Sequence, residues 1–197
     1  MKIRPLTLLA FALITPGTRV AHAGSRDVQA DIARRAALHP VADAVAMRAW
    51  LNRVPLTRDF PPDFTTTLQG EAPMFIVEMT TSPGCVPCAD LWEKLHALRT
   101  QYRLQIALLP ADEAMVRSGR LGLPWIGHPV AWVRARNDPR RVVPVAIGTD
   151  HRINLARNIY LGFKMMTGVR PAVGVRAMAK FTGITGATAP RPTPRRK

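Results

Sequence analysis

Apolar residues in the central part of the chain follow a strand pattern, then a helical pattern, then a strand pattern again. Residues 71–79 end in a nearly continuous apolar run, which predicts a buried strand. Residues 85–99 have leucines at helical spacing and predict a helix with a buried stripe, made of Leu91, Leu95 and Leu98. A second apolar run, 103–109, predicts another strand. Strand, helix and strand in this order indicate a parallel pair with a crossover helix.

The pattern continues with a helix over 112–118, then two strands over 130–133 and 142–147 that we interpret as a β-hairpin. Pro144 lies within the second of these strands, so this strand should be at an edge or contain a bulge. Asp150 is expected to cap a final helix. Its apolar positions are Ile153, Leu155, Ile159 and Phe163. Trp92 and Trp132 are interpreted as core residues.

The first 23 residues have the pattern of a secretory signal peptide. Lys2 and Arg4 precede an apolar stretch over 6–14, which is too short to span a bilayer comfortably. Ala21-His22-Ala23 has the form of a cleavage site, so the mature chain should begin at Gly24. We therefore expect a periplasmic location, where disulfides persist. An uncleaved membrane anchor is the alternative.

Residues 24–70 are expected to form a helical N-terminal extension with a linker. Apolar residues recur at helical spacing over 28–36 and 41–49, and His39-Pro40 separates these two helices. Prolines over 54–62 indicate a linker or an extended segment. The apolar faces are thin and rich in alanine. We expect them to pack on the rest of this chain, with a partner protein as the alternative.

Residues 167–197 are expected to form a basic C-terminal extension. The chain has 28 Lys and Arg against 13 Asp and Glu, a formal charge of +15, and no acidic residue follows Asp150. This asymmetry predicts attraction of the C-terminus to an anionic surface, with simple solvation of an arginine-rich chain as the alternative. Aromatic residues do not interleave with the basic ones, so specific nucleic-acid binding is not expected. Residues 187–197 should be disordered.

The two cysteines of the chain, Cys85 and Cys88, form a Cys-x-x-Cys between the first predicted strand and its helix. A thiolate at a helix N-terminus is stabilised by unpaired backbone N–H groups and the helix dipole, so the pKa of Cys85 should be lowered. Cys88 lies one turn further on and can resolve a mixed disulfide. The pattern favours thiol–disulfide exchange. A purely structural disulfide is the alternative, although so small a ring constrains little of the unfolded chain.

Two cysteines cannot form a multi-disulfide scaffold or an all-cysteine zinc site. A mixed zinc site would need two further ligands, and the spacing of His96 and His128 from the cysteines matches no common finger pattern. We therefore expect no metal.

The order of predicted elements, together with two motifs, resembles the thioredoxin family. Proline precedes the second cysteine in Cys85-Val86-Pro87-Cys88, as in thioredoxins, and Gly127-His128-Pro129 resembles the segment that supplies the family's cis-proline. The resemblance covers residues 71–166. It implies an α/β, thioredoxin-like fold, in which a central mixed sheet is flanked by helices, and a thiol:disulfide oxidoreductase that needs no cofactor. Both extensions lie outside it.

A second segment, Thr167-Gly168-Val169-Arg170-Pro171, also resembles a cis-proline segment, as in DsbC-like isomerases with a helical insertion. No helical pattern long enough to close that fold follows Thr182. We therefore prefer Pro129 over Pro171.

The resemblance implies catalytic roles for Cys85, Cys88, Pro129 and Glu78. Cys85 would be the nucleophile and Cys88 the resolving thiol. Pro129 would place backbone groups beside the sulfurs to pair with an extended substrate. Glu78 lies in the strand before the cysteines, where thioredoxins carry a buried acid that relays protons and has a raised pKa. A solvated glutamate at an edge is the alternative.

Substrate binding is assigned to His128, Pro87 and Trp125. Pro87 would fix the backbone of the first helical turn and shape the dithiol. His128, when protonated, would stabilise the Cys85 thiolate, with an exposed, unengaged histidine as the alternative. Trp125 would line the groove, although a packing role is favoured for it.

The sequence therefore predicts a periplasmic thiol:disulfide oxidoreductase, with a dedicated role in secretion, conjugation or cytochrome c maturation expected by analogy only. Its partners would be proteins with cysteine pairs and a membrane redox protein that recycles the dithiol. The alternative is a non-enzymatic assembly or binding factor of an envelope machine, in which the extensions bind and the cysteines are incidental.

Overall fold

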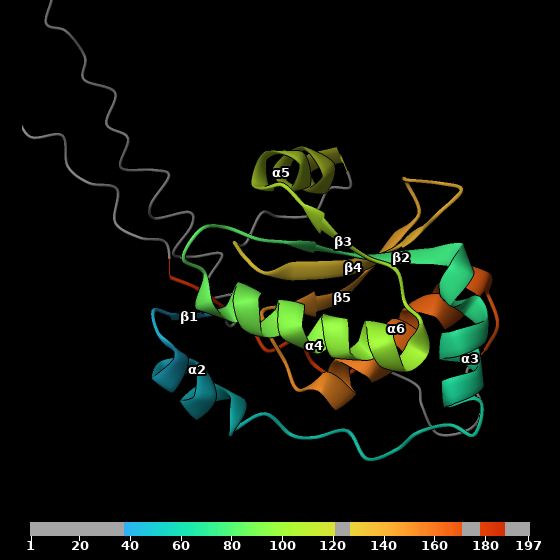
Figure 1. Ribbon diagram of the computed structural model, residues 1–197, viewed down its shortest axis with the longest axis horizontal. Helices are drawn as coiled ribbons and strands as arrows, with labels where there is room; N and C mark the ends of the chain where they lie inside the picture. The colour runs from blue at the N-terminus through green and yellow to red at the C-terminus, as the bar shows by residue number, and fades with distance from the viewer. Residues whose placement is uncertain (1–37, 121–126, 171–177, 188–197) are drawn as a thin grey trace, which may run out of the picture.

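A mixed four-stranded sheet forms the centre of the computed structural model, which describes residues 38–120, 127–170 and 178–187 (Figure 1). Its strands lie in the order β3-β2-β4-β5. Strand β2 (Phe75–Thr80) is parallel to β3 (Ile106–Leu109) and antiparallel to β4 (Val130–Ala135), and β4 is antiparallel to β5 (Val142–Ile147). The observed fold is thus mixed α/β, and the expected parallel pair with a crossover helix is present.

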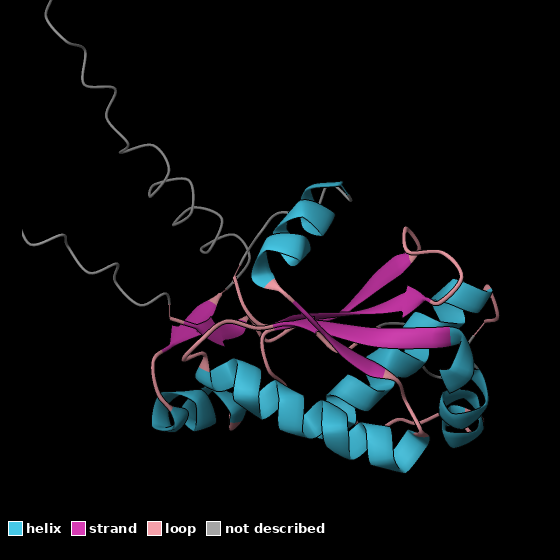
Figure 2. Ribbon diagram, turned by 45° about the horizontal axis from the view of Figure 1, so that its top comes forward, coloured by secondary structure: helices cyan, strands magenta, loops and turns pink. Residues whose placement is uncertain are grey.

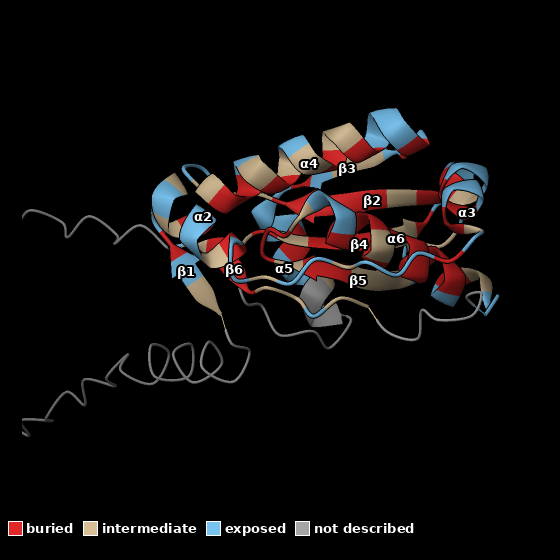
Figure 3. Cartoon of the chain, turned by 90° about the horizontal axis from the view of Figure 1, so that it is seen from below, coloured by how far each residue is buried: buried red, intermediate tan, exposed pale blue. Residues whose placement is uncertain are grey.

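Helices cover both faces of this sheet (Figure 2). Helices α3 (Phe64–Glu71), α4 (Val86–Tyr102) and α6 (Arg152–Thr167) pack on one face through a single buried cluster, while α5 (Ala111–Arg120) lies over the other. The predicted leucine stripe of α4 is buried against the strands, as Figure 3 shows. This layered arrangement fixes the N-terminus of α4, which carries the two cysteines, at one end of the sheet.

Pro144 lies in β5, which is an edge strand of the sheet. It is paired with Trp132 of β4, and the register shifts between Ala131 and Trp132. The strand that contains Pro144 therefore lies at an edge and also has an irregularity in its pairing, the two features expected for a proline in a strand. Trp132 is buried, as predicted.

The N-terminal and C-terminal extensions meet in a second, two-stranded sheet. Strand β1 (His39–Val41) pairs in parallel with β6 (Ile184–Gly186), and α2 (Ala44–Leu51) packs against them. Asp43 caps α2 by accepting the N–H groups of Val45 and Ala46. A small apolar cluster holds these elements together, made of Val41, Met47, Leu51 and Ile184 with Val86 of α4 alongside. The described part of the N-terminal extension thus packs on its own chain, as expected.

Several boundaries differ from the prediction. No helix was predicted between the linker at 54–62 and the strand expected at 71–79, but Phe64–Glu71 form α3. The single turn Ala72–Met74 of 3-10 helix follows, so β2 begins at Phe75, four residues later than expected. Helix α2 begins three residues later than the predicted stretch 41–49, because Val41 belongs to β1. His151 rather than Asp150 is the N-cap of α6. The Asp150 carboxylate instead accepts hydrogen bonds from the His151 N–H and the Asn154 amide.

Other predictions lie outside the described residues. These are the signal peptide 1–23, the helix over 28–36, Trp125, Pro171 and the tail beyond residue 187. Within the described ranges, no helix combines the length and the apolarity that a bilayer crossing requires.

Candidate active site

Cys85 and Cys88 are joined by a disulfide at the N-terminus of α4, with their Cα atoms 5.2 Å apart. Cys85 is the N-cap residue and is partly exposed, whereas Cys88 lies inside the first turn and is 2% exposed. The two cysteines therefore differ in exposure. A thiolate from outside reaches Cys85 far more readily than Cys88.

The first turn of α4 presents a hydrogen-bond donor to the outer sulfur. The N–H of Cys88 donates to the Sγ of Cys85 over 3.2 Å. Pro87 lies in the same turn, as predicted, where its missing N–H leaves no helical hydrogen bond unmade. When the disulfide is reduced, this donor and the helix dipole both favour the thiolate form of Cys85.

The peptide bond between His128 and Pro129 is cis, as predicted. The carbonyl of His128 accepts the N–H of Gly186 over 2.9 Å, and the carbonyl of Pro129 accepts the N–H of Gly148 over 2.8 Å. The backbone before β4 is thus joined to β6, the strand that also touches Cys85. The His128 carbonyl, one of the backbone groups of this loop, is thus hydrogen-bonded within the chain.

Gly186 forms one wall of the site. A Cβ atom placed on Gly186 would lie 3.0 Å from the Sγ of Cys85 and 3.4 Å from its Cβ. Only a residue without a side chain fits there without displacing the sulfur. Strand β6 is held on both sides, because the N–H of Ala187 donates to Val41 and the N–H of Thr149 donates to Ile184.

An uncharged hollow of about 460 Å³ lies on another side of the disulfide. We call it the Cys85 hollow. Its apolar lining includes Met79, Val86, Trp92 and Leu108, and its polar groups are the hydroxyls of Thr81 and Ser82. Leu108 is about half exposed although it belongs to β3. Trp92, which was expected in the core, packs against the core and also lines this hollow.

His128 is half-buried, and this burial lowers the pKa of its imidazole below the ordinary value of 6.5. The neutral ring is therefore favoured at neutral pH. Because Cys85 is in the disulfide here, stabilisation of its thiolate by a protonated His128 stays a prediction.

Glu78 is buried, as expected, but the structure does not bring its carboxylate to the disulfide. Side chains alternate along β2, so Val77 and Met79 face the cluster that contains Cys88, while Glu78 faces the α5 side. Its carboxylate accepts hydrogen bonds from Trp132 over 2.7 Å and from Arg134 over 2.6 Å, and it pairs with Arg117 of α5. A proton-relay role for Glu78 has no geometric support.

Sequence reasoning missed Gly186. This residue is far from the cysteines in the sequence and belongs to a three-residue strand. The glycine-rich stretch 183–186 was a possible signal for a close approach, but its partner could not be named from the sequence. Trp125 lies outside the described residues, so its place in the groove is not described.

Among the described residues, no group of three or more histidine, cysteine, aspartate or glutamate side chains is arranged to hold a metal ion. Comparison of the chain with protein-family models, curated proteins and solved structures found no match.

Proposed function

We propose that the chain is a thiol:disulfide oxidoreductase with a thioredoxin-like fold. The sheet order β3-β2-β4-β5, with its parallel first pair and antiparallel hairpin, supports this fold. Gly186 contacts both Cys85 at the start of α4 and the loop before β4. The cysteine pair and the cis-proline loop therefore lie near each other, which further supports this fold.

The observation that carries the proposal is the unequal exposure of the two cysteines. In the oxidised protein, a substrate thiolate attacks the Sγ of Cys85, a new disulfide forms with Cys85, and Cys88 leaves as a thiolate. A second substrate thiolate then attacks the substrate sulfur of this mixed disulfide, and Cys85 leaves as a thiolate. The substrate loses two electrons, and the protein gains them as a dithiol.

The same steps in reverse reduce a substrate disulfide. Cys85 attacks it, and Cys88 then attacks the mixed disulfide and releases the reduced substrate. In both directions Cys85 is the sulfur that bonds to the substrate. The N–H of Cys88, 3.2 Å from that sulfur, favours its departure as a thiolate. The direction in a cell would depend on a recycling partner, which we propose to be a membrane redox protein of the periplasm.

The alternative is a binding or assembly factor of an envelope machine that does not use its cysteines. The contact between Gly186 and Cys85 is the observation that favours it, because this contact narrows access to the outer sulfur. The two functions make opposite predictions about cysteine variants.

Trapping of a mixed disulfide tests the proposal. Cys88→Ser should accumulate a mixed disulfide with a peptide that contains a disulfide, because the resolving thiol is gone. Cys85→Ser is the matched control and should accumulate little, because the remaining thiol is buried. Equal trapping by both variants, or none by either, would contradict the assigned roles and favour the binding factor.

The reduction potential of the pair then separates the directions. Equilibration of the full chain with glutathione buffers, followed by thiol labelling, measures it. A value near about −270 mV would identify a reductant, and one near about −120 mV an oxidant. A disulfide that is reduced only when the protein unfolds would contradict the oxidoreductase.

A further inference from the structure

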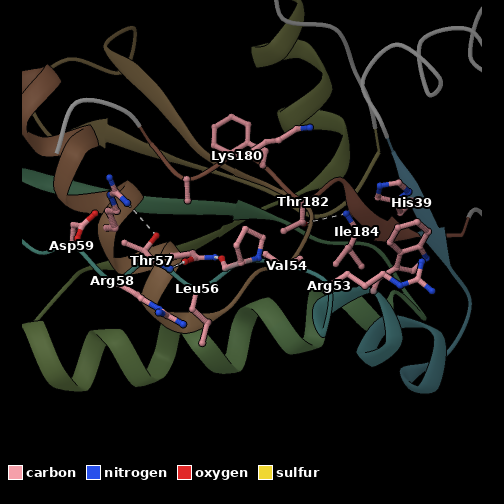
Figure 4. Close-up of a pocket in the computed structure, with 16 residues that line it drawn as sticks. His39, Arg53, Val54, Leu56, Thr57, Arg58, Asp59, Lys180, Thr182 and Ile184 are labelled. Carbon is pink, nitrogen blue, oxygen red and sulfur yellow. Dashed lines mark hydrogen bonds between the residues drawn. The ribbon is translucent and has the colours of Figure 1, made fainter. Parts of the chain in front are cut away.

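A second hollow lies away from the disulfide, and its lining combines apolar walls with unpaired cations. Its volume is about 610 Å³, within the usual range for small-molecule sites. One side is the strap, which we define as residues 53–59 between α2 and α3, and across from it lie Lys180, Thr182 and Ile184 (Figure 4). We call this hollow the strap pocket.

Side chains at the N-terminal end of α6 hold the strap and the end of α2 in place. Asn154 donates to the carbonyl of Pro55 over 3.0 Å and accepts the N–H of Thr57 over 2.8 Å. The ring of His151 contacts the carbonyl of Leu51 over 2.9 Å. The walls of the pocket therefore exist before any ligand arrives, which lowers the entropic cost of binding.

The apolar walls come from three separate parts of the chain. Trp50 belongs to α2, and Phe181 and Ile184 belong to the C-terminal segment. Leu56 of the strap is 56% exposed although it lines the pocket. An aliphatic chain lying along these walls would remove apolar surface from water, which is favourable in proportion to the area covered.

The charge around the pocket is strongly unbalanced. Its lining includes four cationic side chains and one carboxylate, that of Asp59. In the described part of the chain, none of these five groups takes part in an ion pair. The cations are Arg53, Arg58, Arg157 and Lys180. Arg53 stacks over Trp50, with its guanidinium carbon 4.9 Å from the ring centroid, and so leaves its N–H groups available.

Arg157 of α6 is the most informative of these residues. Its Nε is buried and has no hydrogen-bond partner, and its Nη1 donates only to the neutral hydroxyl of Thr57 over 3.3 Å. A guanidinium has five N–H donors, and burying one of them without an acceptor is costly. An anionic group at the Arg157 end of the pocket would balance the charge of this guanidinium, which in the described part of the chain faces only a neutral hydroxyl.

From these observations we infer that the strap pocket binds a single-chain anionic amphiphile, a long-chain carboxylate. Its carboxylate would pair with Arg157, in the planar geometry that a guanidinium offers. Its alkyl chain would lie along Trp50, Leu56 and Phe181. This site is separate from the dithiol, and the inference does not depend on the proposed oxidoreductase activity.

Titration calorimetry of the full chain tests this inference. Dodecanoate, kept below its micelle concentration, should bind at one site per chain. Acetate has the head group alone and dodecyl maltoside has an uncharged head, so both should bind at least about tenfold more weakly, as expected when either half of the interaction is lost. Failure of dodecanoate to bind, or equal binding of dodecyl maltoside, would overturn the inference.

Two variants locate the site. Arg157→Gln should weaken dodecanoate binding about tenfold or more. Arg140→Gln, an equal loss of charge at an exposed turn outside the pocket, should leave it unchanged. Because Arg157→Gln removes a partly buried side chain, Leu56→Asp provides a second variant at an exposed position, where the new carboxylate should repel the ligand. Unchanged binding by either pocket variant would overturn the inference.

A short peptide of four glutamates is the last arm of the test. It carries more negative charge than dodecanoate but no alkyl chain, so it should not displace dodecanoate. Displacement at similar concentrations would show that the pocket recognises acidic peptides, and the assigned ligand class would be wrong.

Discussion

Gly186 of β6 lies so close to Cys85 that a Cβ atom added to Gly186 would be only 3.0 Å from the Sγ of Cys85. The contact is fixed from both ends. Gly186 donates its N–H to the carbonyl of His128, and Cys85 is anchored as the N-cap of α4. A residue of the C-terminal extension therefore belongs to the wall of the site. This makes the C-terminal segment part of the dithiol environment.

Gly186→Ala should slow thiol–disulfide exchange and destabilise the oxidised protein. The added methyl would lie 3.0 Å from the sulfur, so the sulfur or β6 would have to shift against the hydrogen bonds that hold β6. Overpacking of this kind costs about 1–3 kcal/mol of stability. A barrier raised by about 1.4 kcal/mol would slow the reaction tenfold. The rate of reaction of the reduced protein with glutathione disulfide, and urea denaturation of the oxidised protein, measure the two effects.

Gly70→Ala in α3 is the matched control, because a Cβ atom there meets nothing within 4 Å. It should leave the exchange rate unchanged and raise stability by up to about 1 kcal/mol through helix propensity. An exchange rate of Gly186→Ala equal to that of the control would show that the wall does not affect the sulfur.

The central elements of this fold were predictable because their patterns are local. The leucine stripe of α4, the hairpin and the cis-proline loop can each be found in short windows of sequence. Strands β1 and β6 were not predictable, since each has three residues and forms only by pairing with a strand more than 140 positions away. Helix α3 was missed because its Phe64-Thr65-Thr66-Thr67 start is rich in β-branched residues, which favour strands.

The proton-relay role expected for Glu78 lacks geometric support for a different reason. The alternation of Val77, Glu78 and Met79 shows that Glu78 points away from its two neighbours, but not which face carries the cysteines. Arg117 and Arg134 face it from α5 and β4, and only the folded sheet brings them together. Candidate chemistry could be named from the sequence, whereas the face of the sheet on which it lies could not.

Glu78→Gln should lower the free energy of unfolding without changing the exchange rate. The variant leaves Arg117 and Arg134 largely buried beside a neutral amide, and breaking a buried ion pair in this way costs about 3–5 kcal/mol. The dithiol is on the other face of the sheet and should react as before. Chemical denaturation and the glutathione exchange rate, both on the reduced protein, provide the two measurements.

Glu113→Gln removes the other carboxylate that pairs with Arg117 and serves as its control. Glu113 is exposed, so its loss should cost at most about 1 kcal/mol. If Glu78→Gln instead slowed exchange and left stability intact, the carboxylate would act as a proton relay despite its distance from the disulfide.

Folding stability should fall as the pH is lowered through the ordinary pKa of histidine, in part because of His128. Burial lowers the pKa of His128 in the folded state below 6.5, so the unfolded chain takes up this proton first. The contribution is fully present above pH 6.5 and is lost as the pH falls toward the lowered pKa. Urea denaturation at several pH values between about 7.5 and 5.5 measures the slope.

His128→Gln isolates this contribution, because other histidines and carboxylates remain in both proteins. As the pH falls, the unfolding free energy of the wild type should decrease relative to that of the variant. A difference that is independent of pH would show that His128 titrates alike in both states.

Ile184→Ala should loosen β6 from the site before it affects the central sheet. Ile184 is 1% exposed and fills the small cluster between β1, α2 and the start of α4, so its truncation should cost about 2–5 kcal/mol. This cluster is separate from the main core, and its opening can therefore be local.

Hydrogen exchange of single amides distinguishes local from global opening. The Gly186 amide, which donates to His128, should exchange faster in the variant, while the Val77 amide, which donates to Gln105, should keep its protection. Because Gly186 then retreats from Cys85, reaction of that sulfur with a bulky peptide disulfide should speed up relative to its reaction with glutathione disulfide. Equal loss of protection at both amides would show that β6 unfolds only with the whole domain, and the wall beside Cys85 would then be a permanent part of the site.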